Sequence, residues 1–315
     1  MNPLYDYNKC FVRKYNDTTY KLVMLSCVRA RGYDLDQPRH GKGEVNDFKL
    51  SNNLQRSKSK ILELALCNPW EFFVTFTLSP EKYNRHDLSK FKKDLGQFIS
   101  DYNKRNKIGD HVKYLFIPEV HKDGTWHMHG LIYGISECVL HKFTLSEKIP
   151  HGILNMIKKG TDVFKWQAYE NKFGWNTMTK VKDSKACSFY ITKYLTKEVL
   201  SSVQELSKHS YLVSHGLKRS EVIAEGYLNQ DYVHDFEGPY ATVDWFEDKE
   251  DALSRIEPFD FDGYRQLRDR QRVRLAKSRK WIHELMKKRF ETGEWIECKY
   301  YWNRIPFIVD VKVNV

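Results

Sequence analysis

Two histidines and a glutamate stand close together in the segment EVHKDGTWHMHG, residues 119–130. Side chains alternate along a strand, so His127 and His129 would point to one face, about 7 Å apart along it. Two imidazoles and a carboxylate with room for further ligands suit a catalytic divalent ion, whereas structural zinc takes a closed tetrahedral set. The segment therefore predicts an open metal site formed by His127, His129 and Glu119. The alternative is an exposed hairpin whose histidines are incidental.

The length of the turn decides whether Glu119 can share that site. A three-residue loop at 123–125 would place Glu119 opposite His129 on one surface. The same loop would place His121 opposite His127. A two-residue loop would put Glu119 on the other face. The metal hypothesis thus predicts a loop with an odd residue count, and it leaves the role of His121 open.

Two tyrosines form a second group that could do chemistry. The segment FYITKYLTKE places Tyr190 and Tyr194 four residues apart, on one face of a predicted helix. Lys193 and Lys197 each follow a tyrosine by three residues. A phenol with a pKa of about 10 is a poor nucleophile at neutral pH, so activation needs a metal ion at the electrophile or a nearby ammonium. The alternative is that both tyrosines are half-buried core residues of an amphipathic helix.

The elements that would position these residues indicate an antiparallel sheet with helices packed on its face, an α+β fold. EFFVTFTLSP (71–80) is rich in aromatic and β-branched residues and predicts a strand. Apolar residues at helical spacing predict a helix at 86–106, and 183–200 predicts the helix that carries the tyrosines. The other predicted strands are 111–120 and 126–135, which form the hairpin, 211–223 and 305–315.

The chain carries a formal net charge of +11. A basic surplus favours a polyanionic partner, because each Lys or Arg at a phosphate releases counterions, although a basic protein can also be merely solvated. The basic segment 264–290 predicts a helix that either grips duplex DNA or faces solvent. The predicted organisation is a polar N-terminal extension (1–55), a domain that carries the motifs (56–235), an acidic connector (236–263) and a basic C-terminal region with a helix and a strand (264–315).

Several function classes lack support in the sequence. No GxxxxGK[ST] motif occurs, so a built-in P-loop helicase is not expected. The six cysteines never form CxxC, which argues against a zinc cluster and gives no disulfide framework. No apolar run approaches the roughly 20 residues of a membrane span, and the first residues have no apolar signal-peptide core. A cytoplasmic location without membrane association is expected.

Three motifs resemble, in order and rough spacing, those of the HUH endonucleases that initiate rolling-circle replication. They are FFVTFTLS at 72–79, HMHG at 127–130 and YITKYLTK at 190–197. The doubled tyrosine is most similar to the two-tyrosine replication initiator (Rep) proteins of small single-stranded DNA phages and related plasmids. The resemblance spans about residues 70–200 and implies the HUH sheet, which is related to RNA-recognition and ferredoxin-like folds.

The resemblance implies site-specific nicking and joining of origin DNA. One tyrosine would form a 5′-phosphotyrosine and leave a 3′-OH that primes synthesis, and the second would allow the displaced strand to be cut and rejoined. The implied metal ligands are His127, His129 and Glu119, with Mg²⁺ or Mn²⁺ as the ion; the implied catalytic residues are the nucleophiles Tyr190 and Tyr194 and the basic residues Lys193 and Lys197.

The implied partners are single-stranded and duplex origin DNA, together with a host helicase and a host DNA polymerase. The setting would be the bacterial cytoplasm if a phage or plasmid encodes the chain. A HUH transposase or a conjugative relaxase shares this chemistry. An alternative from another class is a non-catalytic nucleic-acid-binding protein with an RNA-recognition-like sheet, in which histidines and tyrosines only stack on bases.

Overall fold

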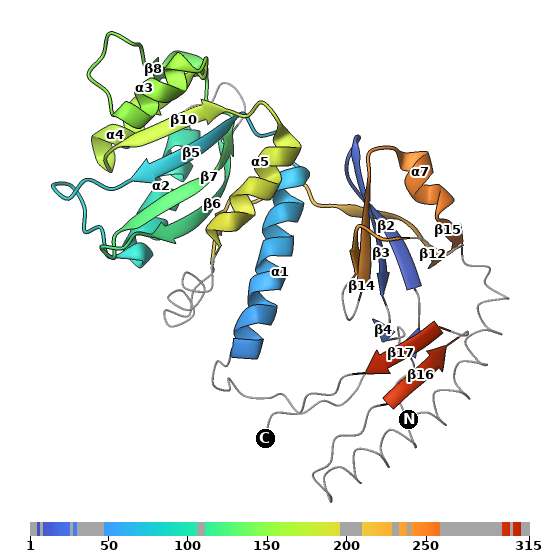
Figure 1. Ribbon diagram of the computed structural model, residues 1–315. Helices are drawn as coiled ribbons and strands as arrows, with labels where there is room; N and C mark the ends of the chain where they lie inside the picture. The colour runs from blue at the N-terminus through green and yellow to red at the C-terminus, as the bar shows by residue number, and fades with distance from the viewer. Residues whose placement is uncertain are drawn as a thin grey trace, which may run out of the picture.

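The computed structural model describes residues 5–6, 9–25, 28–29, 47–105, 111–195, 210–228, 233–237, 241–258, 298–302 and 305–309. In this part of the chain most strands belong to two antiparallel sheets, and helices pack against both (Figure 1). The α+β fold class predicted from the sequence is confirmed. Within these ranges no helix combines the length and the apolar character needed to cross a membrane.

The first sheet has seven strands and carries the first two sequence motifs. Strand β5 (Phe72–Thr77) buries every second side chain, namely Phe72, Val74 and Phe76, because side chains alternate across a sheet. The intervening residues therefore lie on the opposite face. The strand order is β11 (Leu212–Val213), β6 (Lys113–Val120), β7 (Trp126–Tyr133), β5, β10 (Asn176–Lys180), β9 (Val163–Trp166) and β8 (Leu140–Lys142).

Helices α2 (Leu88–Arg105) and α4 (Gln167–Lys172) pack on the face that contains Phe76. Tyr169 of α4 stacks on Phe76 with ring centroids 4.1 Å apart. The helix predicted at 86–106 is confirmed, and its buried residues recur at helical spacing. They are Leu88, Phe91, Leu95, Phe98 and Ile99.

Helices α1 (Asp47–Leu66) and α5 (Ser184–Ile191) lie on the opposite face of this sheet (Figure 1). The carboxylate of Asp183 caps α5 by accepting a hydrogen bond from the backbone N–H of Ala186 at 2.8 Å. The helix predicted at 183–200 is too long, because a 3₁₀ turn, η2 (Thr192–Tyr194), follows Ile191. The hydroxyl of Thr192 donates to the carbonyl of Phe189 in this tightened turn. Residues 196–200 lie outside the described part.

A second sheet of six strands lies beside α5 (Figure 1). Helix α7 (Lys249–Ser254) packs on one of its faces, over the buried Val12 and Leu22. The predicted extension (1–55) and the predicted connector (236–263) both supply strands, so the former is not only a polar arm; the domain boundaries themselves stay predictions. The strand order is β13 (Phe236–Glu237), β14 (Ala241–Phe246), β3 (Thr19–Leu25), β2 (Lys9–Asn16), β12 (Glu221–Leu228) and β15 (Ile256–Pro258).

The other predicted elements are placed as follows. The segment 211–223 holds two strands, β11 and the start of β12, separated by a turn in which Gly216 has a φ of 77°. The hairpin of β16 (Cys298–Trp302) and β17 (Ile305–Val309) agrees with a strand within 305–315. The predicted basic helix at 264–290 lies outside the described residues. The remaining elements are β1 (Tyr5–Asp6), β4 (Val28–Arg29), η1 (Glu137–Val139) and α3 (His151–Lys158).

Candidate metal and tyrosine site

The β6–β7 hairpin puts Glu119 on the same face as both motif histidines. Glu119 lies opposite His127, and five residues separate the paired strand ends Val120 and Trp126. The predicted odd count is therefore correct, and the side-chain parity that it implies holds. The predicted pairs, Glu119 with His129 and His121 with His127, are wrong by two residues.

The side chain of Asp123 explains this register. Its carboxylate accepts hydrogen bonds from the backbone N–H of Thr125 at 3.1 Å and from the Thr125 hydroxyl at 2.7 Å. Gly124 takes the left-handed conformation, with a φ of 78°, and its N–H donates to the carbonyl of His121 at 2.8 Å. The tight loop is thus Lys122 to Gly124, one residue earlier than predicted.

Two threonines of β5 hold the histidine rings. The hydroxyl of Thr75 lies 3.1 Å from Nδ1 of His129, and the hydroxyl of Thr77 lies 3.1 Å from Nδ1 of His127. The Nε2 atoms are thereby left for other partners, which is how a metal-binding histidine is usually oriented. The sequence prediction assigned no role to Thr75 or Thr77. Their signal was the i, i+2 spacing within FFVTFTLS, which places both hydroxyls on the face of the histidines.

The carboxylate of Glu119 converges with the histidines. Nε2–H of His129 donates to Oε2 of Glu119 at 2.6 Å, while Nε2 of His121 lies 3.8 Å from the same oxygen. The ring of His121 stacks on that of His127, with centroids 3.7 Å apart. Across the described residues, no three His, Cys, Asp or Glu side chains already surround a common point. A bound ion would have to replace the hydrogen bond between His129 and Glu119.

The donor set nevertheless fits a divalent ion. Two imidazole nitrogens and one carboxylate leave coordination positions open for a substrate oxygen and water. When Nε2 of His129 binds an ion, its proton resides on Nδ1, where the hydroxyl of Thr75 can accept it. The contact with Thr75 therefore serves both protonation patterns of the ring, and only the Glu119 side chain has to shift.

Burial keeps both imidazoles neutral. It lowers the pKa of His127 to about 4, and the neighbouring rings of His121 and His129 add to this effect. Burial also lowers the pKa of His129, against the opposing influence of Glu119. A neutral imidazole is the form that donates a lone pair to a metal ion. At neutral pH the two side chains are therefore in the state that a metal requires.

Gly130, the last residue of HMHG, lets strands β6 and β7 approach each other beside the site. A Cβ at this position would lie 2.2 Å from the ring of Phe116 and 2.4 Å from the carbonyl oxygen of Leu115. Any larger residue would push β6 away from β7 and move Glu119 relative to His129. The glycine thus contributes to the geometry of the carboxylate and the histidines.

The tyrosines of α5 and η2 lie over this group. The ring of Tyr194 stacks on that of His129, with centroids 4.0 Å apart and planes 10° from parallel. The hydroxyl of Tyr194 donates to that of Tyr190 at 3.2 Å. Tyr190 is 47% exposed, whereas Tyr194 packs against the core of the sheet. The structure therefore brings one predicted nucleophile onto a predicted ligand and leaves the other open to solvent.

The two phenols differ in acidity. Nζ of Lys193 lies 3.5 Å from the ring centroid of Tyr190, and its hydrogen bond lowers the pKa of that phenol; the bond from Tyr194 adds to the effect. Burial, followed by the contact with Tyr190, raises the pKa of Tyr194. Tyr190 is therefore the more readily ionised of the pair. Lys197, the fourth predicted catalytic residue, lies outside the described residues.

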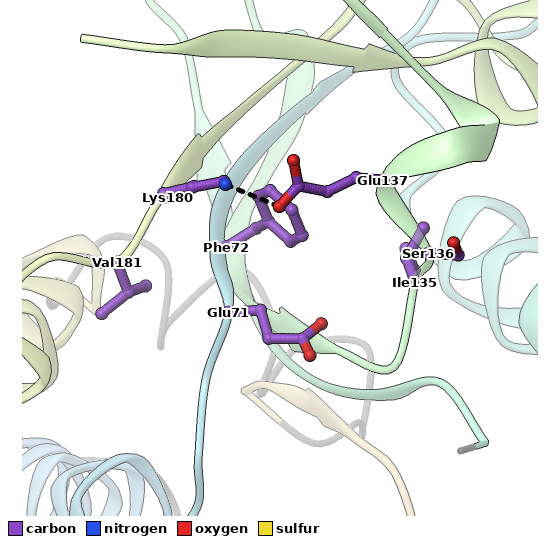
Figure 2. Close-up of a pocket in the computed structure, with 7 residues that line it drawn as sticks. All are labelled: Glu71, Phe72, Ile135, Ser136, Glu137, Lys180 and Val181. Atoms are coloured by element: carbon purple, nitrogen blue, oxygen red, sulfur yellow. Dashed lines mark ion pairs between the residues drawn. The ribbon is translucent and has the colours of Figure 1, made fainter. Parts of the chain in front are cut away.

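The pocket drawn in Figure 2 lies at the other end of strands β5 and β10. Lys180 and Glu137 form an ion pair of 2.6 Å at this pocket, and Glu71 accepts a hydrogen bond from the N–H of Gly134 at 2.9 Å. Its charged groups thus have partners within the protein. None of the predicted metal ligands or tyrosines lines it, so the open sheet face beneath Tyr190 and Tyr194 is the candidate site.

Comparison with known proteins supports this choice of region. No curated protein and no solved structure matches the chain. Residues 71–199 match a family model of replication-associated proteins, the one named for ORF2. The matched region includes all three sequence motifs and less than half of the chain. In this region the chain is similar to replication-associated proteins, which supports a role in replication initiation.

Proposed function

We propose that the sheet face beneath α5 is the centre of a metal-dependent enzyme that nicks and rejoins origin DNA in rolling-circle replication. The stacking of Tyr194 on His129 at 4.0 Å carries this proposal, because it joins the tyrosine motif to the histidine motif. The family match adds replication as the biological setting. Mg²⁺ or Mn²⁺ would be held by His127, His129 and Glu119.

The bound ion would polarise the scissile phosphate and neutralise charge that develops on it. Tyr190 would lose its proton to solvent, aided by Lys193, and its oxygen would attack the phosphorus in line. An oxygen–phosphorus bond to the tyrosine forms, the bond to the 3′ oxygen breaks, and that oxygen takes up a proton. The product is a 5′-phosphotyrosine with a free 3′-OH, and attack by such a hydroxyl on the phosphotyrosine reverses the step.

The proposed partners follow from these products. The 3′-OH is a primer end for a host DNA polymerase. Because the sequence has no P-loop motif, a host helicase would open the duplex origin. Phosphoryl transfer at Tyr190 requires a strand that can leave the base-paired stack, so single-stranded DNA is the direct substrate.

A covalent-adduct assay tests the proposed function. The full-length protein is incubated with Mn²⁺ and a random pool of single-stranded oligonucleotides, and SDS-resistant protein–DNA adducts are isolated and sequenced. We expect an adduct that EDTA abolishes and that is enriched in one sequence. The double variant Tyr190→Phe/Tyr194→Phe should give none, whereas Tyr211→Phe should match wild type. No adduct from any pool, or an adduct with the double variant, would overturn the proposal in favour of non-catalytic binding.

Lys193→Ala should move the pH dependence of nicking to higher pH. The ammonium lowers the pKa of Tyr190, so its removal raises that pKa and reduces the phenolate fraction at neutral pH. The rate at fixed neutral pH should fall about tenfold for each unit by which the pKa rises. Single-turnover rates from pH 6 to 10, as a rough range, measure the shift. Lys185→Ala, on the same helix but paired with Glu247, is the control, and an unchanged profile for Lys193→Ala would contradict the prediction.

A further inference from the structure

The second sheet has one face that differs from an ordinary packing surface. Helix α7 packs on the face that contains Val12 and Leu22. On the other face, partly exposed aromatic and cationic residues alternate across strands β2, β3 and β14. We call this surface the Trp245 platform. It consists of Phe11, Arg13, Tyr15, Lys21 and Trp245, with Phe189 of α5 at its border.

The cations of the platform lie against aromatic rings. Nζ of Lys21 lies 5.2 Å from the ring centroid of Trp245, and the guanidinium of Arg13 lies 5.4 Å from that of Phe11. The rings of Tyr15 and Trp245 are 5.5 Å apart. Such neighbouring rings and cations bind single strands elsewhere, because bases stack on the rings and phosphates contact the cations.

The platform has an uncompensated positive charge. Arg13 lies directly opposite Lys21 in the β2–β3 pair, an arrangement that like charges disfavour. Burial, followed by the charge of Arg13, lowers the pKa of Lys21. In the described ranges neither of the two forms an ion pair; the carboxylate of Glu225, on the neighbouring strand β12, is paired with Lys9 at 2.8 Å. A polyanion would relieve this repulsion.

The platform is continuous with the tyrosine site. The ring of Phe189 meets that of Trp245 edge-on, with centroids 5.7 Å apart, and α5 lies between the two sheets (Figure 1). Phe189 is 41% exposed and directly precedes Tyr190 in the chain. A strand whose phosphate lies at Tyr190 could therefore continue over Phe189 onto Trp245.

We infer that the Trp245 platform binds single-stranded DNA next to the scissile phosphate, with bases stacked on Phe189 and Trp245 and phosphates at Lys21 and Arg13. The inference rests on the proposed function for the position of the scissile phosphate, but the binding itself needs no cleavage. It gives the second sheet a role in holding the strand that enters or leaves the tyrosine site.

Binding of fluorescent oligothymidylates to the full-length protein in EDTA tests this inference. Trp245→Ala should weaken the binding of a strand long enough to span both surfaces about tenfold, as expected for lost base stacking. Phe236→Ala is the matched control, because Phe236 is 61% exposed on the edge strand of the same sheet. Lys21→Gln should reduce the slope of log affinity against log salt by about 0.7, the value for one phosphate contact on a single strand.

Three further outcomes keep the test decisive. Thermal unfolding of each variant separates lost binding from lost folding, and Phe189→Ala gives a second stacking variant on another element. Wild-type affinity in folded Trp245→Ala and Phe189→Ala, or an equal loss on duplex DNA, would overturn the inference. The double variant Tyr190→Phe/Tyr194→Phe should bind as wild type does. Absence of a covalent adduct with platform-dependent binding intact would overturn the proposed function and leave this inference standing.

Discussion

Tyr190→Phe should abolish the first nick on a single-stranded substrate, whereas Tyr194→Phe should retain it. Tyr190 is the exposed phenol, and Lys193 lowers its pKa. Tyr194 has its ring stacked on His129 and its pKa raised by burial. A phenylalanine keeps the ring contacts and removes the nucleophile, so the loss for Tyr190→Phe should be about a thousandfold or more.

The measurement is single-turnover cleavage of an oligonucleotide recovered from the adduct pool. Mass spectrometry of the digested adduct should locate the 5′ phosphate on Tyr190 in wild type and in Tyr194→Phe. Tyr211→Phe, which changes a partly buried tyrosine outside the site, is the control. If the first phosphate is found on Tyr194, the assignment of the two roles is reversed.

The two variants should differ again in the joining step. A second tyrosine is useful only when the first still holds a DNA end, so Tyr194→Phe should accumulate adduct and form few rejoined circles. Tyr194 must leave the ring of His129 before it can attack, and loss of its hydrogen bond to Tyr190 frees it to do so. Modification of Tyr190 by the first transfer removes that acceptor. The contact between the two hydroxyls is thus consistent with an ordered sequence.

The parts of the fold that were predictable are those fixed by local periodicity. The helix at 86–106 and the strand of FFVTFTLS each bury residues at the spacing of a single element, and that spacing is visible in the sequence. The second sheet joins β2 and β3 to β12 and β14, which are far away in the chain. Its strands mix polar and apolar residues, so the pattern is readable only once the partner strands are known.

The same distinction holds at the site. The alternation of side chains predicted that Glu119, His127 and His129 share a face if the loop has an odd count. The register depended on one side chain, Asp123, whose hydrogen bonds to Thr125 select the loop at Lys122 to Gly124. Thr75 and Thr77 acquire their role only by pairing with the histidine strand. Contacts between elements, unlike periodicity within one, are not written in spacing alone.

His129→Ala should abolish specific Mn²⁺ binding and, with it, adduct formation. Loss of a group that merely orients a metal ligand typically costs roughly 10–100-fold in affinity, so loss of the ligand should cost more. Thr75→Val keeps the shape of the side chain and removes the hydroxyl that lies 3.1 Å from Nδ1 of His129. It should therefore give the intermediate loss. Isothermal titration with Mn²⁺ measures binding independently of cleavage.

Glu119→Gln and His121→Ala test which side chain completes the site. Glu119 contacts His129 at 2.6 Å, whereas His121 stacks on His127 with no threonine to orient its ring. We therefore expect Glu119→Gln to weaken Mn²⁺ binding about tenfold or more and His121→Ala to leave it close to wild type. His86→Ala, which removes a hydrogen bond to the loop at Gly124, controls for loosening of the hairpin. If His121→Ala loses binding and Glu119→Gln does not, the third ligand is His121, and the carboxylate acts on His129 alone.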